Sequence, residues 1–251
     1  MLRLVRVTGW VDGVYVFPDT IVGDHQRLWI YRPRHPRPAA AEVGGSLEDW
    51  SRLVAARAVH SPYLVFGIAV AFASMLLEPL GVESGGFHLH GTSDPGKRSS
   101  IGKTLCLRVA SSVFGSAARN SLGGWRGSDR GLEDLAATRN DQLLCLDEPR
   151  RSSADSREAE KRIRQIAFMI ASERGRELAA GYTGGGGPVT WRLLMLSSGE
   201  EAIVELVTGG RLKGEEVRFI DLPIGVDPEL GIFRRLPTRF EMEWREKGTA
   251  R

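Results

Sequence analysis

Hydrophobic positions recur at two periods along this chain, and the alternation of the two periods predicts an α/β protein. Short apolar runs typical of buried strands lie at residues 87–90, 142–147, 191–197 and 217–222. Stretches with helical spacing lie between or after them, at residues 105–114, 132–138, 157–174 and 200–207. Because strands and helices alternate, we expect a mostly parallel sheet with helices on both faces.

The first part of the chain has a different pattern. Residues 10–17 alternate around an Asp-Gly turn, and a further short strand is expected at residues 28–31. Residues 32–41 are rich in proline and arginine, which is typical of a solvated connector, although a basic loop of this kind could also contact nucleic-acid phosphates. We therefore expect a small β-rich region at residues 1–45.

Two helices are predicted next. Ser46 and Asp49 form a capping box that opens a helix running to about Val59. The apolar stretch at residues 61–80 predicts a second helix. The predicted organisation is then a β-rich region at 1–45, a helical segment packing on the core at 46–84, the core at 85–233, and a divergent tail at 234–251.

Composition adds limits on location and partners. The most apolar run, residues 63–77, is shorter than the roughly 20 residues that a membrane-spanning helix needs, so we expect a buried helix and no membrane contact. Cys106 and Cys145 lie in apolar surroundings without metal-ligand spacing, which suits a reducing compartment. With no secretory signal visible, we expect a cytoplasmic protein; the net charge of +3 permits nucleic-acid binding without arguing for it.

A strand, a Gly/Ser-rich loop, Gly-Lys-Thr and a helix follow one another between residues 84 and 115, which is the layout of a phosphate-binding P-loop. Backbone N–H groups at such a loop and at the helix N-terminus point into one concavity, where the helix dipole favours an anion. Lys103 would reach the outer phosphates of ATP, and the Thr104 hydroxyl would be a ligand of Mg²⁺. The residues expected to surround the nucleotide are Gly91, Ser100, Ile101, Gly102, Lys103, Thr104 and Leu105.

The spelling of this loop is irregular. Read back from Gly102, the pattern GxxxxGK[ST] places Lys97 where a glycine should stand. A second frame, from Gly91 to Lys97, fits the glycines but places Arg98 where the hydroxyl should be. Removing residues 94–99 would leave GTSSIGKT, a complete match, so we interpret the loop as a P-loop with an insertion and favour Lys103 over Lys97. An ordinary Gly/Ser turn remains the alternative.

A second motif lies about forty residues downstream. The apolar run at residues 142–146 ends in Asp147 and Glu148, the arrangement of a Walker B strand. Asp147 would hold Mg²⁺, and Glu148 would orient or deprotonate the attacking water. A P-loop followed at this distance by such a strand predicts a P-loop NTPase core. Ser198, or Ser197 beside it, ends the next strand, where it would sense the γ-phosphate, cap the following helix, or do both.

Several long segments of the chain together resemble one known family, the domain of unknown function 927 family of phage, plasmid and integrative-element proteins. The segments are GWVDGVYVFPDTIVG, ESGGFHLHGTS, SIGKTLCLRVASSVFG, GLEDLAATRNDQLLCLDE, TWRLLMLSSGE and GEEVRFIDLP. The resemblance implies a RecA/AAA-like ATPase of the replicative-helicase kind. It places Lys103 and Thr104 in Walker A, Asp147 and Glu148 in Walker B, and Ser198 as the sensor.

The resemblance also implies roles and partners that the residues alone do not indicate. Arg218 would be an arginine finger or a structural residue, and Asn140 would be structural. Single-stranded or forked DNA, a primase and further copies of the chain in a ring are the implied partners.

The departures from the family pattern leave the activity open. Residues 94–99 interrupt the Walker A loop, and from about residue 234 the resemblance ends. Three hypotheses follow: a Mg²⁺-dependent ATPase that moves along DNA, a nucleotide-binding or assembly module that no longer hydrolyses ATP, and a DNA-binding accessory protein without nucleotide.

Overall fold

The structure is a computed structural model of the chain, and it describes a defined set of residues. These are residues 2–33, 44–91, 101–115, 117, 122–147, 156–176, 188–206, 219–224 and 231–233.

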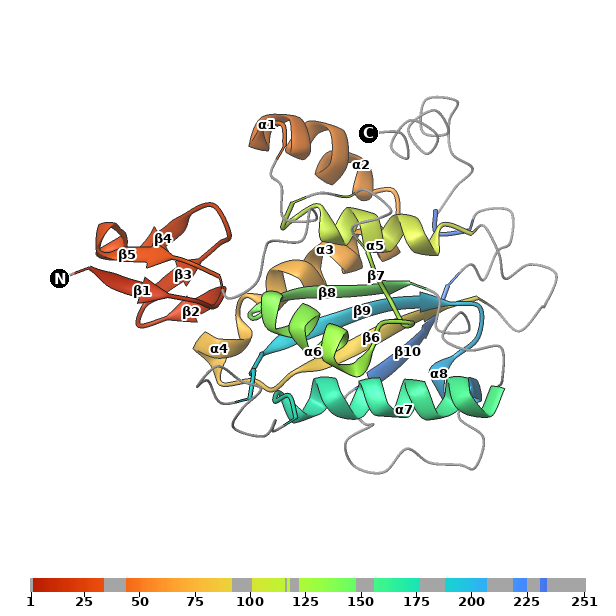
Figure 1. The fold of residues 1–251 in the computed structure, drawn as a ribbon. Coiled ribbons are helices and arrows are strands. Elements are labelled where there is room, and N and C mark those ends of the chain that lie inside the picture. Colours follow the sequence, from red (N-terminus) through yellow and green to blue (C-terminus); the bar gives the residue numbers. More distant parts are fainter. Residues whose placement is uncertain are drawn as a thin grey trace.

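A five-stranded sheet forms the centre of the fold, in the order β10-β6-β9-β8-β7, and every neighbouring pair is parallel. The bounds are β6 Gly85–His90, β7 Gly123–Gly124, β8 Gln142–Asp147, β9 Leu193–Gly199 and β10 Phe219–Pro223. The expected parallel α/β sheet is therefore confirmed. Strand β9 lies between β6 and β8, so it separates the two strands that carry the predicted Walker motifs (Figure 1).

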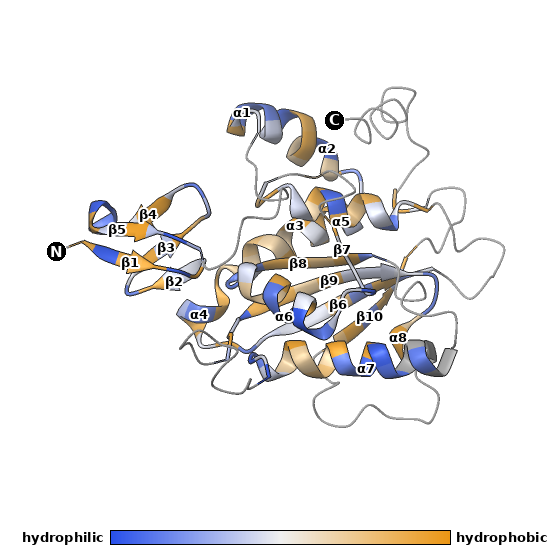
Figure 2. Cartoon of the chain, viewed as in Figure 1, coloured by the Kyte–Doolittle hydropathy of each residue, from blue (hydrophilic) through white to orange (hydrophobic). Residues whose placement is uncertain are grey.

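Helices cover both faces of this sheet, as expected (Figure 1). On one face, α3 (Pro62–Ser74) and α5 (Lys103–Ser111) share a core with Leu89, Leu143 and Leu196. On the other, α6 (Asp129–Thr138) and α7 (Ser156–Ser172) enclose a second core. Figure 2 shows that the middle of β8 is apolar, whereas α7 carries apolar and polar stretches. This difference is expected for a central strand and a surface helix.

The helical segment before the sheet begins as predicted. Ser46 caps α1 (Leu47–Trp50), and its hydroxyl accepts a hydrogen bond from the backbone N–H of Asp49 at 3.1 Å. A π-helical turn (Ser51–Ala55) and α2 (Ala56–Ala58) continue it.

The single helix expected at residues 61–80 is in fact two. α3 is followed by α4 (Leu77–Leu80), which ends at Gly81 with φ 63°. Across the described ranges, no helix is both long enough and apolar enough to cross a membrane.

A small β-module precedes the helices and projects from the core (Figure 1). β2 (Gly9–Val11), β3 (Val14–Val16) and β4 (Ile21–Gly23) form an antiparallel sheet. β1 (Arg3–Val5) pairs in parallel with β5 (Trp29–Tyr31), and a 3-10 turn (Gln26–Leu28) precedes β5. The Asp-Gly turn predicted between β2 and β3 is present, with φ 46° at Asp12 and 82° at Gly13, which is a type I′ arrangement.

The module docks on the start of β8 through Asn140 and Asp141. The side-chain amide of Asn140 donates to the carbonyl of Thr8 at 2.9 Å, and its oxygen accepts from the backbone N–H of Arg192 at 2.8 Å. The Asp141 carboxylate accepts from the backbone N–H of Trp10 at 2.9 Å. The Tyr15 hydroxyl donates to the carbonyl of Asp141 at 2.6 Å. Asn140 therefore joins three segments of the chain beside the amino end of β8, the end opposite Asp147.

One capping assignment is wrong. The helix expected at residues 200–207 is described as α8 (Ile203–Leu206), and Ser198 does not cap it because Ser198 lies within β9. The first N–H groups of α8, those of Ile203 and Val204, instead donate to the carboxylate of Asp221 on β10 at 2.8 and 3.1 Å.

Candidate nucleotide site

Helix α5 begins at Lys103, directly after Gly102 of the predicted P-loop and near the carboxyl end of β8. Gly102 stands before its first residue with φ 102°, a conformation that glycine adopts without strain. A Cβ at Gly102 would also lie 2.8 Å from Ile232. Lys103 is the first residue of the helix and is 9% exposed. The local structure therefore brings Lys103 and the N–H groups of the first turn of α5 to the carboxyl edge of the sheet.

Three predicted site residues come together at this edge. Asp147 ends β8 and pairs in register with Ser198 on β9. The Ser198 hydroxyl donates to Oδ1 of Asp147 at 2.5 Å, and the Thr104 hydroxyl on α5 lies 3.3 Å from Oδ2. Thr104 and Asp147 are 43 positions apart in sequence, and Asp147 and Ser198 are 51 apart. The parallel register of β8 and β9 brings the second pair together, and the packing of α5 on β8 brings Thr104 to them.

The chemistry of these groups suits a small hard cation. A hydroxyl oxygen and a carboxylate are the protein ligands that Mg²⁺ accepts, alongside water and phosphate oxygens. Thr104 and Asp147 present both types of oxygen beside the helix N-terminus, where a phosphate would bind. The residues present therefore fit Mg²⁺ bound together with a nucleotide.

Other members of the predicted site stand in different positions. Gly91 directly follows β6, and Ile101 is buried beside Gly102. The Leu105 side chain packs against the core, so that only its backbone could face a phosphate. Ser100, Lys97, Glu148 and Arg218 lie outside the described residues, and their roles stay predictions.

A short segment near the end of the described chain binds the residues before α5 and was not singled out from the sequence. The N–H of Ile232 donates to the carbonyl of Ile101 at 3.1 Å, and the Ser61 hydroxyl donates to the carbonyl of Ile232 at 2.5 Å. Gly231 approaches so closely that a Cβ there would lie 2.7 Å from the Ile101 oxygen. Gly231 is the residue in this segment that could have suggested a close backbone approach, but the sequence does not indicate that Ile101 is the residue it approaches.

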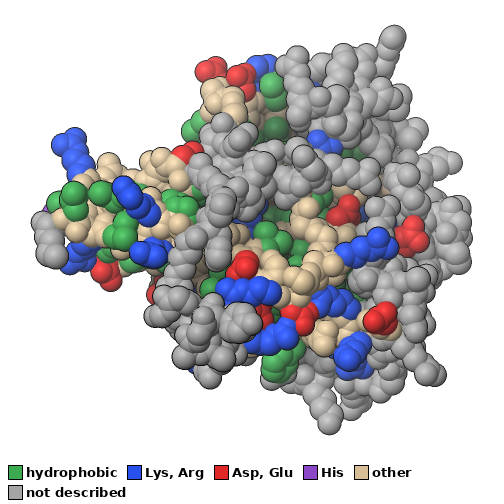
Figure 3. All heavy atoms as spheres, viewed as in Figure 1, with side chains coloured by type: hydrophobic (Ala, Val, Ile, Leu, Met, Phe, Trp, Pro, Cys, Tyr) green, Lys and Arg blue, Asp and Glu red, His purple; other side chains and the backbone are tan. Residues whose placement is uncertain are grey.

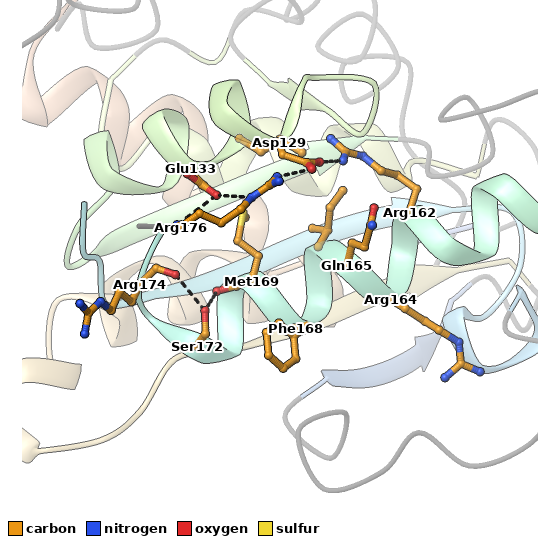
Figure 4. A pocket seen from close by; sticks show the side chains of 12 residues that line it. Asp129, Glu133, Arg162, Arg164, Gln165, Phe168, Met169, Ser172, Arg174 and Arg176 are labelled. Carbon is orange, nitrogen blue, oxygen red and sulfur yellow. Dashed lines mark hydrogen bonds and ion pairs between the residues drawn. The ribbon is translucent and has the colours of Figure 1, made fainter. Parts of the chain in front are cut away.

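A cavity of about 420 Å³ lies elsewhere, between α6 and α7 (Figure 4). Its polar wall is an ion-pair cluster in which Asp129 binds both Arg162 and Arg176, while Glu133 accepts from Nε of Arg176 at 3.2 Å. Figure 3 shows basic and acidic side chains interspersed on this side of the molecule. Thr104, Asp147 and Ser198 do not line the cavity, so it is separate from the candidate nucleotide site.

Comparison with solved structures gives a likeness over nearly the whole chain. The SCCmec type IV Cch protein, described as an active helicase, matches with a TM-score of 0.67 and 15% sequence identity. The match covers 98% of this chain and 44% of that one, so this chain spans less than half the length of the helicase that it resembles. At this identity the likeness shows the fold alone, a parallel α/β sheet flanked by helices. No curated protein matches the sequence.

The sequence itself matches one family model. The model is described as a domain of unknown function, DUF927, and the match extends over residues 1–185, well over half of the chain. The resemblance noted from the sequence segments is therefore confirmed, and the chain belongs to the DUF927 family.

Proposed function

We propose that this chain is a Mg²⁺-dependent ATPase of a mobile-element helicase, coupling ATP hydrolysis to movement along DNA. The observation that carries the proposal is the meeting of Thr104, Asp147 and Ser198 at the carboxyl edge of the sheet, beside the N-terminus of α5. In parallel α/β sheets this edge is where ligands bind.

In this proposal, residues of the chain have separate roles in ATP binding and hydrolysis. The N–H groups of the first turn of α5 and the Lys103 ammonium hold the β- and γ-phosphates. Ser198 donates its hydroxyl toward the γ-phosphate, and Glu148 orients the attacking water and accepts its proton. Mg²⁺, when bound at Thr104 and Asp147, supplies positive charge against the phosphate oxygens.

The DNA-related part of the proposal has separate support. It rests on the likeness to a structure described as an active helicase and on membership of DUF927. Within this proposal the chains assemble as a ring, Arg218 reaches the γ-phosphate held by a neighbouring copy, and a primase acts beside them on single-stranded or forked DNA.

A second candidate function rests on a specific observation in the sequence. Residues 94–99 interrupt the Walker A loop, and misplacing a phosphate-binding group by about 1 Å can cost about a hundredfold in rate. A chain with this insertion could retain nucleotide binding and assembly without turnover.

The test is ATP hydrolysis with and without single-stranded DNA, in the wild type, Lys103→Ala and Lys97→Ala. We expect DNA-stimulated turnover that is lost in Lys103→Ala and kept in Lys97→Ala. Loss in Lys97→Ala alone would move the phosphate lysine to the other frame. Nucleotide binding without turnover in every protein would favour the binding module, and DNA binding that ignores ATP would overturn both.

A further inference from the structure

A row of polar side chains crosses the sheet on the face opposite the nucleotide site. The register places Asp221 of β10, His88 of β6 and Ser197 of β9 side by side. Because successive side chains of a strand point to opposite faces, this row lies behind the row that contains Ser198 and Asp147. His88 and Ser197 are fully buried.

The two ring nitrogens of His88 have different partners. Nδ1 lies 2.7 Å from the Ser197 hydroxyl, and Nε2 lies 3.0 Å from the carbonyl oxygen of Glu201. A carbonyl can only accept, so Nε2 carries the proton and Nδ1 accepts from Ser197. Burial lowers the pKa of His88 to about 4, the carboxylate of Asp221 opposes this shift, and Lys103 and His90 add to it. The imidazole is therefore neutral at physiological pH, as this hydrogen-bond pattern requires.

The composition of the row invites comparison with an Asp-His-Ser catalytic triad, but its geometry excludes that role. Ser197 is 0% exposed and cannot meet a substrate. The carboxylate of Asp221 accepts from the N–H groups of Ile203 and Val204 rather than orienting His88. His88 and Asp221 thus bind the same short stretch of chain, residues 201–204, where the turn after β9 enters α8.

That turn follows the candidate sensor directly. The ladder between β6 and β9 ends at the pair His90 and Gly199, one residue beyond Ser198. Past Gly199 the bond from His88 to the carbonyl of Glu201 ties the chain back to β6, the strand that leads into the predicted P-loop. Strand ends open locally unless they are tied. We propose that His88 is a positioning residue that holds this turn and thereby keeps Ser198 aligned toward the γ-phosphate.

Two substitutions separate the contacts of His88. His88→Gln keeps an N–H donor near the position of Nε2, whereas His88→Asn is too short to reach Glu201 but keeps an acceptor for Ser197. Because a misplacement of about 1 Å can cost up to a hundredfold in rate, we expect about a tenfold loss of kcat for ATP hydrolysis in His88→Asn, with KM changed less than about threefold. His88→Gln should recover most of the loss.

A double-mutant cycle tests whether His88 acts through Ser198. In a Ser198→Ala background, His88→Asn should reduce kcat by less than about twofold, because the group that it positions is already gone. Ile170→Val, a substitution in the fully buried part of α7, controls for general loss of stability. An equal loss from His88→Asn in both backgrounds, or a loss in His88→Gln as large as in His88→Asn, would overturn the inference.

The inference rests on the proposed function, and a second measurement keeps the two apart. If the wild type does not hydrolyse ATP, the ATPase proposal fails, and the inference is then judged on the affinities for ATPγS and ADP. The preference for ATPγS should fall in His88→Asn and in Ser198→Ala but not in Ile170→Val. An unchanged preference in His88→Asn would overturn the positioning role by itself.

Discussion

Strand β8 is bounded by two aspartates whose surroundings differ. Asp141, just before the strand, accepts from the N–H of Trp10 at 2.9 Å and from the amide of Asn140 at 2.8 Å. Asp147, at the strand's other end, accepts from the hydroxyl of Ser198 at 2.5 Å and faces that of Thr104. The partners of Asp141 are amides fixed by the backbone and by packing, while those of Asp147 are hydroxyls that can rotate.

This difference shows what decides the role of a carboxylate. Fixed amide donors tie Asp141 into the junction with the β-module, and burial raises its pKa to about 6. Rotatable hydroxyls at Asp147 can turn from the carboxylate toward a cation or a phosphate without disturbing the backbone. An aspartate therefore holds the β-module against the core at one end of β8, and an aspartate forms part of a candidate binding site at the other end.

The sharpest way to break the comparison is to make one substitution at both ends. Asp147→Asn should reduce kcat for ATP hydrolysis about a thousandfold, roughly 4 kcal/mol, because an amide cannot replace the charge that the site needs. Asp141→Asn should leave kcat within about twofold, since an amide oxygen accepts the same two hydrogen bonds. Steady-state kinetics measures both, and comparable losses at the two positions would contradict the assigned roles.

The junction can be tested by crowding it. Gly9 has φ 88°, and a Cβ there would lie 2.3 Å from the Asp141 carboxylate and 2.8 Å from the carbonyl of Asn140. Gly13 has a similar φ of 82° but open space around it, which makes it a matched control. Gly13→Ala should cost about 1–2 kcal/mol from backbone strain alone. Gly9→Ala should cost about 2 kcal/mol more. Urea denaturation measures the two, and equal losses would mean that the contact with Asp141 is unimportant.

The raised pKa of Asp141 predicts a pH dependence of the stability. The pKa of Asp141 is about 6 in the folded chain, and its ordinary value is 3.8. The Asp141 carboxyl therefore stays protonated up to a higher pH in the folded state than in the unfolded state. The contribution to stability is fully present below pH 3.8 and is lost as the pH rises through 6. We expect the loss to be about 1–2 kcal/mol after screening by nearby solvent. The wild type should show this slope in urea denaturation relative to Asp141→Asn; parallel pH profiles would refute it.

The smallest expected effect concerns a third kind of carboxylate environment. Asp129 is paired with Arg162 and Arg176 at the cavity between α6 and α7, and the Arg176 side chain is 62% exposed. Arg176→Gln should lower the stability by about 0.5 kcal/mol at low salt, and the loss should vanish near 1 M salt. Thermal unfolding at the two salt concentrations measures this. A salt-independent loss would mean that packing, rather than charge, carries the contact.

The sequence was informative wherever local pattern determines structure. Periodicity located β6, α5, β8 and β9 to within a few residues, and the capping box placed the start of α1. The motifs also selected Thr104, Asp147 and Ser198, which the fold brings together. The spacing of nearby apolar residues is enough to predict which face of a strand a side chain lies on and whether it stands at the end of the strand.

What escaped prediction depends on partners that are distant in sequence. β7 consists of Gly123 and Gly124, which have no side chains to form an apolar pattern. The N-terminus of α8 is bound by Asp221 from another strand, so the alternative in which the nearer Ser198 caps this helix is wrong. Gly9 packs against Asp141 although more than 130 residues separate them in sequence. The residues around each position contain no pattern that predicts this contact. Periodicity also cannot say which strands are neighbours.

The position of β9 between β6 and β8 has a consequence for folding during synthesis and for the choice of fragments to express. β6 and β8 leave the ribosome first. Until residues 193–199 have followed, β8 can pair only with the two-residue strand β7, and neither β6 nor β8 has its shared neighbour β9. The match to the family model ends at residue 185, before this strand begins. We expect a fragment cut at that boundary to leave the edges of β6 and β8 that face β9 unpaired, and to aggregate rather than fold. Expression of this protein in pieces therefore has to keep residue 199 in the same piece as residue 85.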